Sequence, residues 1–237
     1  MAKNAVPGSA GEIASALAVE TIHRHINAAS QNLALSLIGP SDPALSPSGN
    51  RLASAIREAN QAIYREAKQR PEWAGMGTTV VAVLLTEQGM SFAHVGDSRL
   101  YLIHAGTIRQ LTADHSWVAE QVRSGLMTEA EAERSPQRNM VTRAVGVAPT
   151  VNVTTDEIGL QPGDLLLLCS DGLTKGVGAG TLLATLTHTD DMTAATRQLV
   201  ILANRAGGED NITVITLAIH DAMEQPMRSS VRQPVAI

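Results

Sequence analysis

Residues 165–171, with the letters LLLLCSD, constrain the fold of this chain more than any other segment. The five apolar residues from Leu165 to Cys169 are bounded by turn-forming residues, a pattern typical of a short strand buried on both faces. Such a strand places the carboxylate of Asp171 at its end, where Gly172 lets the chain turn. A carboxylate at the edge of a core is costly unless it is paired or binds a metal. We therefore expect other residues of the chain to be partners of Asp171.

Length and composition indicate one globular domain with an aliphatic core. The chain has 237 residues, of which 44% are hydrophobic and only 2% aromatic. Its net charge is −5 and no basic stripe is present, which argues against nucleic acid as a partner. No apolar run approaches the roughly 18 residues of a membrane span, and the N-terminus lacks the apolar core of a signal peptide. Because the single Cys169 has no second cysteine to pair with, we expect a cytoplasmic protein. We also expect the protein to be a monomer.

The first half of the chain reads as two helices followed by strands. Apolar spacing predicts one helix from Ser9 to about Leu37 and another from Leu52 to Pro71, joined by a loop rich in proline, serine and glycine. Short runs of β-branched and apolar residues then predict antiparallel strands at residues 78–85, 90–95, 99–103 and 107–111. Residues 114–146 are more polar and partly helical, so we expect a flap over one sheet edge.

Strands and helices alternate in the second half. We expect strands at residues 151–158, 165–169 and 211–219, and helices around residues 182–186 and 191–206. The tail at 221–237 is polar and contains two prolines, which predicts disorder. The pattern as a whole predicts a single α+β domain over residues 1–220, with largely antiparallel sheets.

Three aspartates occupy similar places between predicted elements. Asp97 lies between two strands, Asp171 ends the buried strand, and Asp210 precedes the last strand. Oxygen ligands without Cys or His favour Mg²⁺ or Mn²⁺ over zinc. If the strand ends converge, the trio could hold two metals about 3.5–4 Å apart, an arrangement that suits hydrolysis of phosphate esters by water without a protein nucleophile. The alternative is that all three are ordinary turn residues, because aspartate is common in turns.

Six segments occur in an order that carries a resemblance. They are GMGTT (75–79), AHVGDSR (93–99), LTADHS (111–116), VTRAVG (141–146), CSDGL (169–173) and GGEDNITV (207–214). Together they closely resemble the bacterial branch of the metal-dependent serine/threonine protein phosphatases, the PPM or type 2C family. The resemblance covers residues 8–219 or so.

The resemblance implies a fold, a reaction and a set of site residues. The fold would be two packed antiparallel β-sheets flanked by helix pairs. The reaction would be hydrolysis of phosphoserine and phosphothreonine in proteins by a metal-activated water, with two or three Mn²⁺ or Mg²⁺ ions, reversing a partner kinase. Asp171 and Asp210 match ligands of the core metals, Asp97 matches a ligand of a third metal, and residues 116–143 match a flap that touches substrate. No substrate-binding residue or side-chain nucleophile is assigned.

The front of the chain departs from that family. Members normally begin with a strand that carries an arginine for the substrate phosphate, and then a strand that ends in Asp-Gly-x-Gly-Gly-His. That second strand directly precedes the helix that starts here at Ser9, and neither strand is present in this sequence. We therefore expect the N-terminal edge strands to be missing, so that one sheet is incomplete and part of the core is uncovered. Retention of Asp97, Asp171 and Asp210 favours sequence lost from the front over an evolved loss of metal binding.

Two other functions remain open. One is a catalytically impaired regulator with the phosphatase fold, which binds a phosphoprotein or a kinase without turnover. The other is a sensory domain related to the phosphatases that control sigma-factor partners, although such domains usually carry sensor modules that this length does not accommodate. Metal binding through Asp171 and Asp210 distinguishes an enzyme from the first alternative.

Other reactive residues have more ordinary explanations. A cysteine phosphatase needs an arginine six positions after its cysteine, but Lys175 stands there, so Cys169 is expected in the core. His94 is expected to be structural, and His115 to cap a helix or face the solvent. Arg143 is expected to form a salt bridge within the flap.

Overall fold

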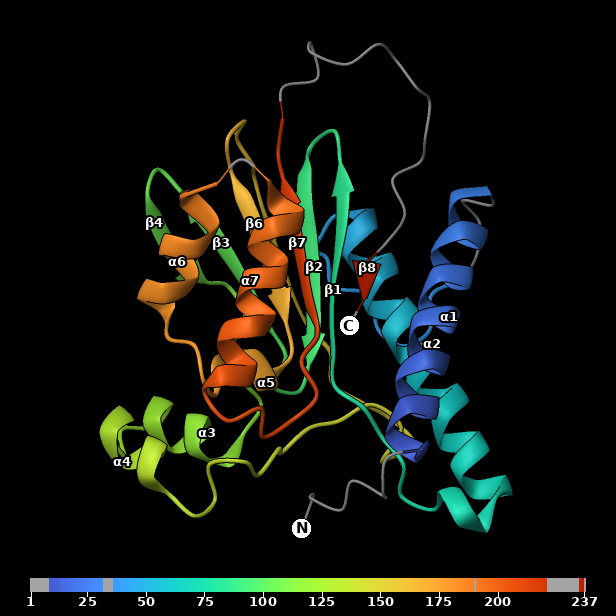
Figure 1. The fold of residues 1–237 in the computed structure, drawn as a ribbon. Helices are drawn as coiled ribbons and strands as arrows, with labels where there is room; N and C mark the ends of the chain where they lie inside the picture. The colour runs from blue at the N-terminus through green and yellow to red at the C-terminus, as the bar shows by residue number, and fades with distance from the viewer. Residues whose placement is uncertain (1–8, 32–35, 190, 221–234, 237) are drawn as a thin grey trace. The chain divides into compact units, whose positions relative to one another are not determined.

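The computed structural model describes residues 9–31, 36–189, 191–220 and 235–236. These residues form two compact units (Figure 1). The first contains the described residues up to Asp97, residues 114–158 and residues 235–236, and the second contains residues 98–113 and 159–220. The sequence predicts one domain that contains both units, and this stays a prediction.

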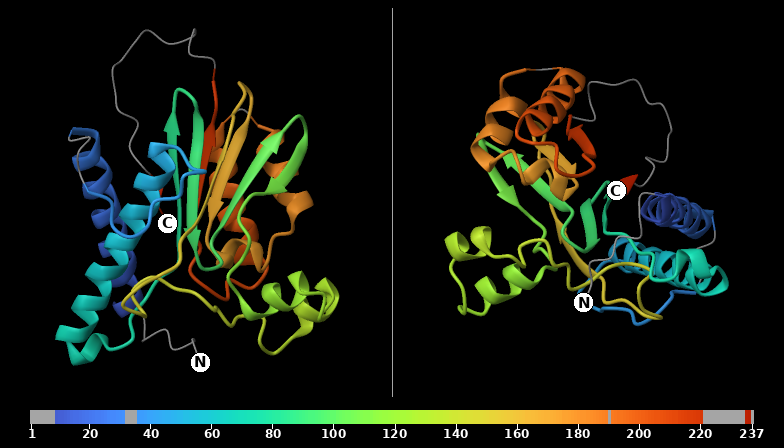
Figure 2. Two further views of the ribbon diagram at one scale, coloured as in Figure 1. Left: turned by 180° about the vertical axis from the view of Figure 1, so that it is seen from behind. Right: turned by 60° about the horizontal axis from the view of Figure 1, so that its bottom comes forward.

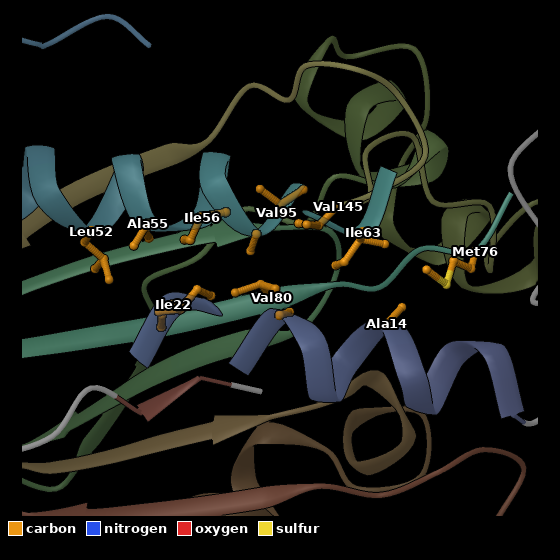
Figure 3. Packing of buried hydrophobic residues seen from close by; sticks show 14 of the residues in the cluster. Ala14, Ile22, Leu52, Ala55, Ile56, Ile63, Met76, Val80, Val95 and Val145 are labelled. Atoms are coloured by element: carbon orange, nitrogen blue, oxygen red, sulfur yellow. The ribbon is translucent and has the colours of Figure 1, made fainter. Parts of the chain in front are cut away.

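The two N-terminal helices of the first unit pack against each other through small and aliphatic residues. Helix α1 (Ser9–Gln31) buries Ala14, Ala18 and Ile22, which lie on one face because they are four residues apart. Helix α2 (Pro47–Gln69) buries a matching stripe that includes Leu52, Ile56 and Ile63 (Figure 3). The helix was predicted to reach Leu37, but residues 36 and 37 are not helical. The described part of α1 runs to Gln31, and residues 32–35 lie outside the described part of the chain.

Helix α2 starts before the predicted Leu52 because its first turn is capped. The side chain of Ser46 accepts hydrogen bonds from the backbone N–H groups of Ser48 and Gly49, and Pro47 occupies the first helical position. A short 3₁₀ turn, η1 (Pro71–Trp73), follows the helix.

The first unit contains an antiparallel sheet with the strand order β5-β2-β1-β8. Its strands are β1 (Val80–Thr86), β2 (Gly89–Val95), β5 (Thr154–Ile158) and β8 (Val235–Ala236). Strand β8 pairs with Ala82 and Val83 of β1, although the sequence predicts a disordered tail there. The rest of the predicted tail, residues 221–234 and 237, lies outside the described residues.

Two short helices follow in the segment predicted as a flap, α3 (Trp117–Arg123) and α4 (Glu129–Arg134). Each has a side-chain cap: Ser116 accepts a hydrogen bond from Ala119 N, and Thr128 forms a capping box with Glu131. The segment is therefore partly helical, as predicted, whereas the cover of a sheet edge by this segment stays a prediction.

The second unit contains the antiparallel sheet β4-β3-β6-β7. Its strands are β3 (Arg99–His104), β4 (Thr107–Gln110), β6 (Leu165–Cys169) and β7 (Val214–Ala218). Strand β6 lies between β3 and β7, and its residues 166–169 have no exposed surface. The prediction of a central strand buried on both faces is therefore confirmed.

Helices α6 (Ala179–Thr187) and α7 (Met192–Arg205) lie beside this sheet, as Figures 1 and 2 show. Their buried residues, among them Leu182 and Leu199, form one apolar cluster with Leu167 and Cys169 of β6. The burial of Cys169 confirms its predicted place in the core. This cluster holds the end of β6 in place, and the chain turns there into the short helix α5 (Asp171–Thr174).

Both sheets agree with the predicted α+β class, but the strand order was not predicted. Strands β2 and β3 are consecutive in the chain and yet belong to different sheets, so the turn at residues 96–98 carries the chain from one sheet to the other. Among the described residues, no strand of either sheet comes from before Val80, as expected from the absent N-terminal motif. None of the described helices has both the length and the hydrophobicity that a membrane span requires.

Candidate functional site

The register between β6 and β7 brings Asp171 and Asp210 to the same end of the second sheet. Cys169, the last residue of β6, pairs with Val214, the first residue of β7. Beyond this pair, Ser170 continues the connection: its N–H donates to Thr213 O at 3.1 Å. Asp171, which follows β6, and Asp210, which precedes β7, are thereby held close together.

Ser170 fixes the same connection with its side chain. Its hydroxyl accepts a hydrogen bond from Thr213 N at 3.0 Å and donates one to Asn211 O at 3.0 Å. One serine therefore satisfies a donor and an acceptor of the segment that carries Asp210. Asp171, the next residue along the chain, is positioned by the same contacts.

Gly172 allows the two segments to approach each other closely. A Cβ atom at this position would lie 2.4 Å from Asn211 O and 3.3 Å from Asp210 O, and the first of these distances is shorter than any van der Waals contact. The motif Asp171-Gly172 thus has a steric basis, because any larger residue would push Asp171 and Asp210 apart.

Lys175 lies between the two carboxylates. The single turn of α5 places Lys175 four residues after Asp171 on the same side, and Lys175 Nζ is 2.5 Å from Asp171 Oδ2. The same Nζ is 2.8 Å from Asp210 Oδ2, while Asp210 Oδ1 accepts a hydrogen bond from Asn211 N at 2.9 Å. The exposed fractions of the side chains are 21% for Lys175, 30% for Asp171 and 44% for Asp210.

The cluster combines two negative charges with one positive charge. Burial lowers the pKa of Lys175, but the hydrogen bonds and charges of Asp171 and Asp210 outweigh it, so the pKa is raised above its ordinary value. Lys175 therefore remains an ammonium group, and the three side chains together carry a net negative charge. The two Oδ2 atoms converge on one cationic centre.

This convergence fits a divalent metal ion. Mg²⁺ in proteins is commonly held by one or two carboxylates, with waters and substrate phosphate oxygens completing its shell. Asp171 and Asp210 supply two such carboxylates, and both are partly exposed to solvent. In the described part of the chain, no three side chains of His, Cys, Asp or Glu gather closely enough to hold one ion by themselves.

Asp97, the third aspartate singled out in the sequence, belongs to the first unit. It follows Gly96, whose φ of 107° is favourable only for glycine and whose Cβ position would lie 2.3 Å from Thr79 Cγ2. The backbone before Asp97 is also bonded to His115: Gly96 N donates to His115 Nδ1 at 3.0 Å and His115 N donates to Gly96 O at 2.9 Å. The role of Asp97 as a metal ligand stays a prediction.

His115 is part of a buried cluster in the first unit, and the expectation that it caps a helix or faces the solvent was wrong. Its exposed fraction is 4%, and its ring stacks on that of His94. His115 Nε2 lies 3.0 Å from Thr154 Oγ1 and 3.1 Å from Arg143 Nη1. Arg143 also donates hydrogen bonds to Asn152 O and Thr154 Oγ1.

The surroundings of His115 disfavour its charged form. Burial lowers its pKa to about 3, with further contributions from the positive charges of His94, Arg143 and Arg123. The ring is therefore neutral at neutral pH. Because Nδ1 accepts the hydrogen bond from Gly96, the proton of the neutral ring is on Nε2, which donates to Thr154. Arg143 Nη1, which is itself a donor, is then a neighbour of Nε2 and not its hydrogen-bond partner.

Sequence reasoning missed the role of Lys175. The spacing of Asp171 and Lys175, four residues apart, is that of an ion pair on one helix face and could have indicated the contact. The signal was weak because only a turn, and no helix, was expected after the buried strand.

Comparison with known proteins agrees with the sequence resemblance. The family model described as protein phosphatase 2C matches residues 7–212. A serine/threonine phosphatase of Listeria welshimeri is 40% identical over 164 residues, which cover 69% of this chain and 65% of that protein. The matched part of the chain thus spans a little under two thirds of the length of this relative.

Solved structures of phosphatases share the fold. The crystal structure of a serine/threonine phosphatase of Mycobacterium tuberculosis superimposes with a TM-score of 0.76 and 32% identity, covering 91% of this chain and 85% of that one. The catalytic domain of the serine/threonine protein phosphatase PstP, solved in complex with two manganese ions, has a TM-score of 0.72 and 30% identity, with 91% and 84% of the chains covered. The predicted fold class, α+β with two antiparallel sheets and flanking helices, is thereby confirmed.

Proposed function

The chain belongs to the protein phosphatase 2C family, and from this premise we propose that it hydrolyses phosphoserine and phosphothreonine in proteins with the help of divalent metal ions. Its relatives named serine/threonine phosphatases support the substrate class, and a related catalytic domain that binds two manganese ions supports the metal. We take Mn²⁺ or Mg²⁺ as the metal, in two or three ions, with Asp171, Asp210 and Asp97 as ligands.

The single observation that carries this proposal is the convergence of Asp171 Oδ2 and Asp210 Oδ2 on one cation. Divalent ions bound by carboxylates neutralise phosphoryl oxygens and activate water for attack on phosphorus. The part of this chain is to hold the two carboxylates at one point, which Gly172 and Ser170 achieve through their contacts with Asn211. The water is the nucleophile, so no side chain need form a covalent intermediate.

The substrates we propose are phosphoproteins made by a partner serine/threonine kinase, so that the protein takes part in signalling. We also propose a cytoplasmic setting, because the sequence contains a single cysteine and therefore cannot form an internal disulfide. A monomer suffices for this reaction, because both aspartates of the pair come from one chain.

A second candidate is the catalytically impaired regulator, which binds a phosphoprotein or a kinase without turnover. The observation that favours it is Lys175, whose ammonium group occupies the point on which Asp171 and Asp210 converge. A permanent internal cation at this point would leave a phosphatase fold without its metal chemistry.

Hydrolysis of a phosphothreonine peptide by the 237-residue chain, with and without Mn²⁺, tests the proposal. We expect metal-dependent turnover that is lost in Asp171→Ala. Asp191→Asn is the matched control, because Asp191 caps α7 and asparagine is an equally good cap. Turnover that survives in Asp171→Ala would show that the site is misassigned. A folded protein without turnover that still binds the phosphopeptide would support the regulator.

A further inference from the structure

Lys175 makes a contact that an ordinary surface lysine does not make. Its ammonium group bonds two carboxylates that come from different segments, at 2.5 Å from Asp171 Oδ2 and 2.8 Å from Asp210 Oδ2. Only 21% of its side chain is exposed, although lysine is usually among the most exposed residues. An ion pair within one helical turn would join Lys175 to Asp171 alone. The second contact of Lys175, with Asp210, therefore points to a function beyond helix stabilisation.

The geometry points to Lys175 as an internal cation that holds the Asp171–Asp210 pair in the metal-free protein and competes with a divalent metal ion for it. This inference rests on the proposed function, because it takes the two aspartates as metal ligands. It adds a residue that tunes metal affinity and that is not itself a ligand, since an ammonium group has no lone pair to donate.

Competition follows from charge and space. The ammonium group and a metal ion would both bind the Oδ2 atoms, which converge on a single point, so they exclude each other. The metal must therefore break two charge-assisted hydrogen bonds before it binds. Such bonds contribute enough to change an equilibrium constant by about tenfold or more.

Displacement of Lys175 is sterically feasible. Its long side chain has several rotatable bonds, and the cluster is open to solvent on the side of Asp210, whose exposed fraction is 44%. Once displaced, the ammonium group remains tethered within one helical turn of Asp171, where it can neutralise an incoming phosphate group. The chain thus alternates between a state closed by Lys175 and a metal-bound state.

Removal of the ammonium group has opposite effects on the two states. Without metal, Lys175→Met leaves two carboxylates facing each other without a shared cation, which lowers stability. With metal, the same variant has no competitor, so its affinity for Mn²⁺ increases. A residue with a purely structural role would lower stability in both states and would not increase affinity.

The test is Mn²⁺ binding to the full 237-residue chain, measured by isothermal titration calorimetry, with thermal unfolding in the absence and presence of Mn²⁺. We expect the Kd of Lys175→Met for Mn²⁺ to be about tenfold lower than that of the parent chain. We also expect its melting temperature to be lower without Mn²⁺ and to rise more steeply as Mn²⁺ is added. Lys175→Arg, which keeps the charge, should resemble the parent.

Two controls separate this inference from the proposed function. Lys68→Met removes the same charge from the first unit, where Lys68 lies over the ring of Tyr64, and should leave the Kd for Mn²⁺ unchanged. Asp171→Asn, alone and with Lys175→Met, should abolish the binding.

The outcomes point to different conclusions. If Asp171→Asn removes Mn²⁺ binding but Lys175→Met binds no more tightly than the parent, Lys175 is not a competitor and only the further inference fails. If Asp171→Asn binds Mn²⁺ as the parent does, the metal site itself is wrong and both fail. If neither the parent nor Lys175→Met binds Mn²⁺, both fail as well. If Lys175→Met binds Mn²⁺ and the parent does not, this result would support a metal site that Lys175 keeps closed.

Discussion

The imidazole rings of His94 and His115 are stacked, with their centroids 4.5 Å apart and their planes inclined by 12°. Gly96 N donates a hydrogen bond to His115 Nδ1, so the stack supports the turn that carries Asp97. A proton on Nδ1 would remove this acceptor and place a positive charge against His94 and Arg143. The neutral state of His115 is therefore part of the folded structure.

From this arrangement we predict that the protein loses stability in acid. The pKa of His115 is 6.5 in an exposed chain and about 3 in the fold, where burial is the main cause and neighbouring positive charges add to it. The unfolded state therefore takes up a proton first as the pH falls. The contribution of His115 to the unfolding free energy is complete above about pH 6.5. Between that pH and about pH 3 the contribution is lost, by at most about 1.4 kcal/mol per pH unit.

Urea unfolding at a series of pH values measures this effect. His115→Gln should show a weaker dependence of the unfolding free energy on pH in that interval, together with a loss of about 1–3 kcal/mol at neutral pH from the hydrogen bonds to Gly96 and Thr154. His188→Gln, at an exposed position after α6, is the control and should retain the parental slope. An unchanged slope in His115→Gln would contradict the prediction.

Gly172→Ala should separate the two aspartates of the candidate site. The added methyl group would lie 2.4 Å from Asn211 O, so the segments on either side must move apart. We expect a loss of about 1–3 kcal/mol in the unfolding free energy, as for overpacking in a core, and weaker Mn²⁺ binding.

Gly180→Ala is the matched control for this substitution. Nothing lies within 4 Å of a Cβ atom at Gly180, which is in the first turn of α6. Alanine favours helices over glycine, so stability should be unchanged or slightly increased. Equal effects of the two substitutions, measured by urea unfolding and calorimetry, would show that the close approach at Gly172 does not matter.

Local patterns in the sequence were sufficient to predict the central strand and the class of the fold. The apolar run of β6 demanded burial on both faces, and the spacing of Leu52, Ile56 and Ile63 demanded a helix with one apolar face. The position of Asp171 at the end of β6 also followed from the sequence. Each of these features depends on residues that are close in the chain.

Features set by contacts between distant residues could not be predicted. Periodicity does not tell which strands pair, so the change of sheet between β2 and β3 was missed. The burial of His115 depends on a stack with His94, 21 positions earlier in the chain. The contact of Lys175 with Asp210 required the pairing of β6 with β7, whereas the contact with Asp171 required only one helical turn.

Asn60 connects helix α2 to residues 146–148, where the predicted flap ends. Its side chain is 1% exposed, Oδ1 accepts a hydrogen bond from Gly146 N at 2.7 Å, and Nδ2 donates one to Ala148 O at 3.0 Å. Asn60→Leu would leave two polar backbone groups without these partners. We expect a loss of at least about 2 kcal/mol in the unfolding free energy, measured with urea. Asn204→Leu on the exposed side of α7 is the control and should change it by less than about 0.5 kcal/mol.

Glu157 of β5 ties the start of helix α2 to strand β2. Its carboxylate accepts hydrogen bonds from Ser46 Oγ and Ser91 Oγ, both at 2.6 Å, and from Ser46 N at 3.0 Å. The hydrogen bond from Ser46 is the main cause that lowers the pKa of Glu157, followed by that from Ser91. The ionised form is therefore favoured in the fold, and its contribution to stability is present above the ordinary pKa of 4.5 and is lost as the pH falls further.

Glu157→Gln replaces one accepting oxygen by an NH₂ group, which would face the donors of Ser46 and Ser91. We expect a loss of about 1–3 kcal/mol in the unfolding free energy at neutral pH, because hydrogen bonds to a charged group are lost. The loss should shrink as the pH falls below 4.5, since the parental carboxylate then becomes protonated as well. Glu87→Gln, in the exposed turn between β1 and β2, should have no comparable effect at any pH. Urea unfolding of both variants at neutral pH and below pH 4.5 measures the change in unfolding free energy. If the loss of unfolding free energy in Glu157→Gln does not depend on pH, the charge of Glu157 is not what stabilises the start of α2.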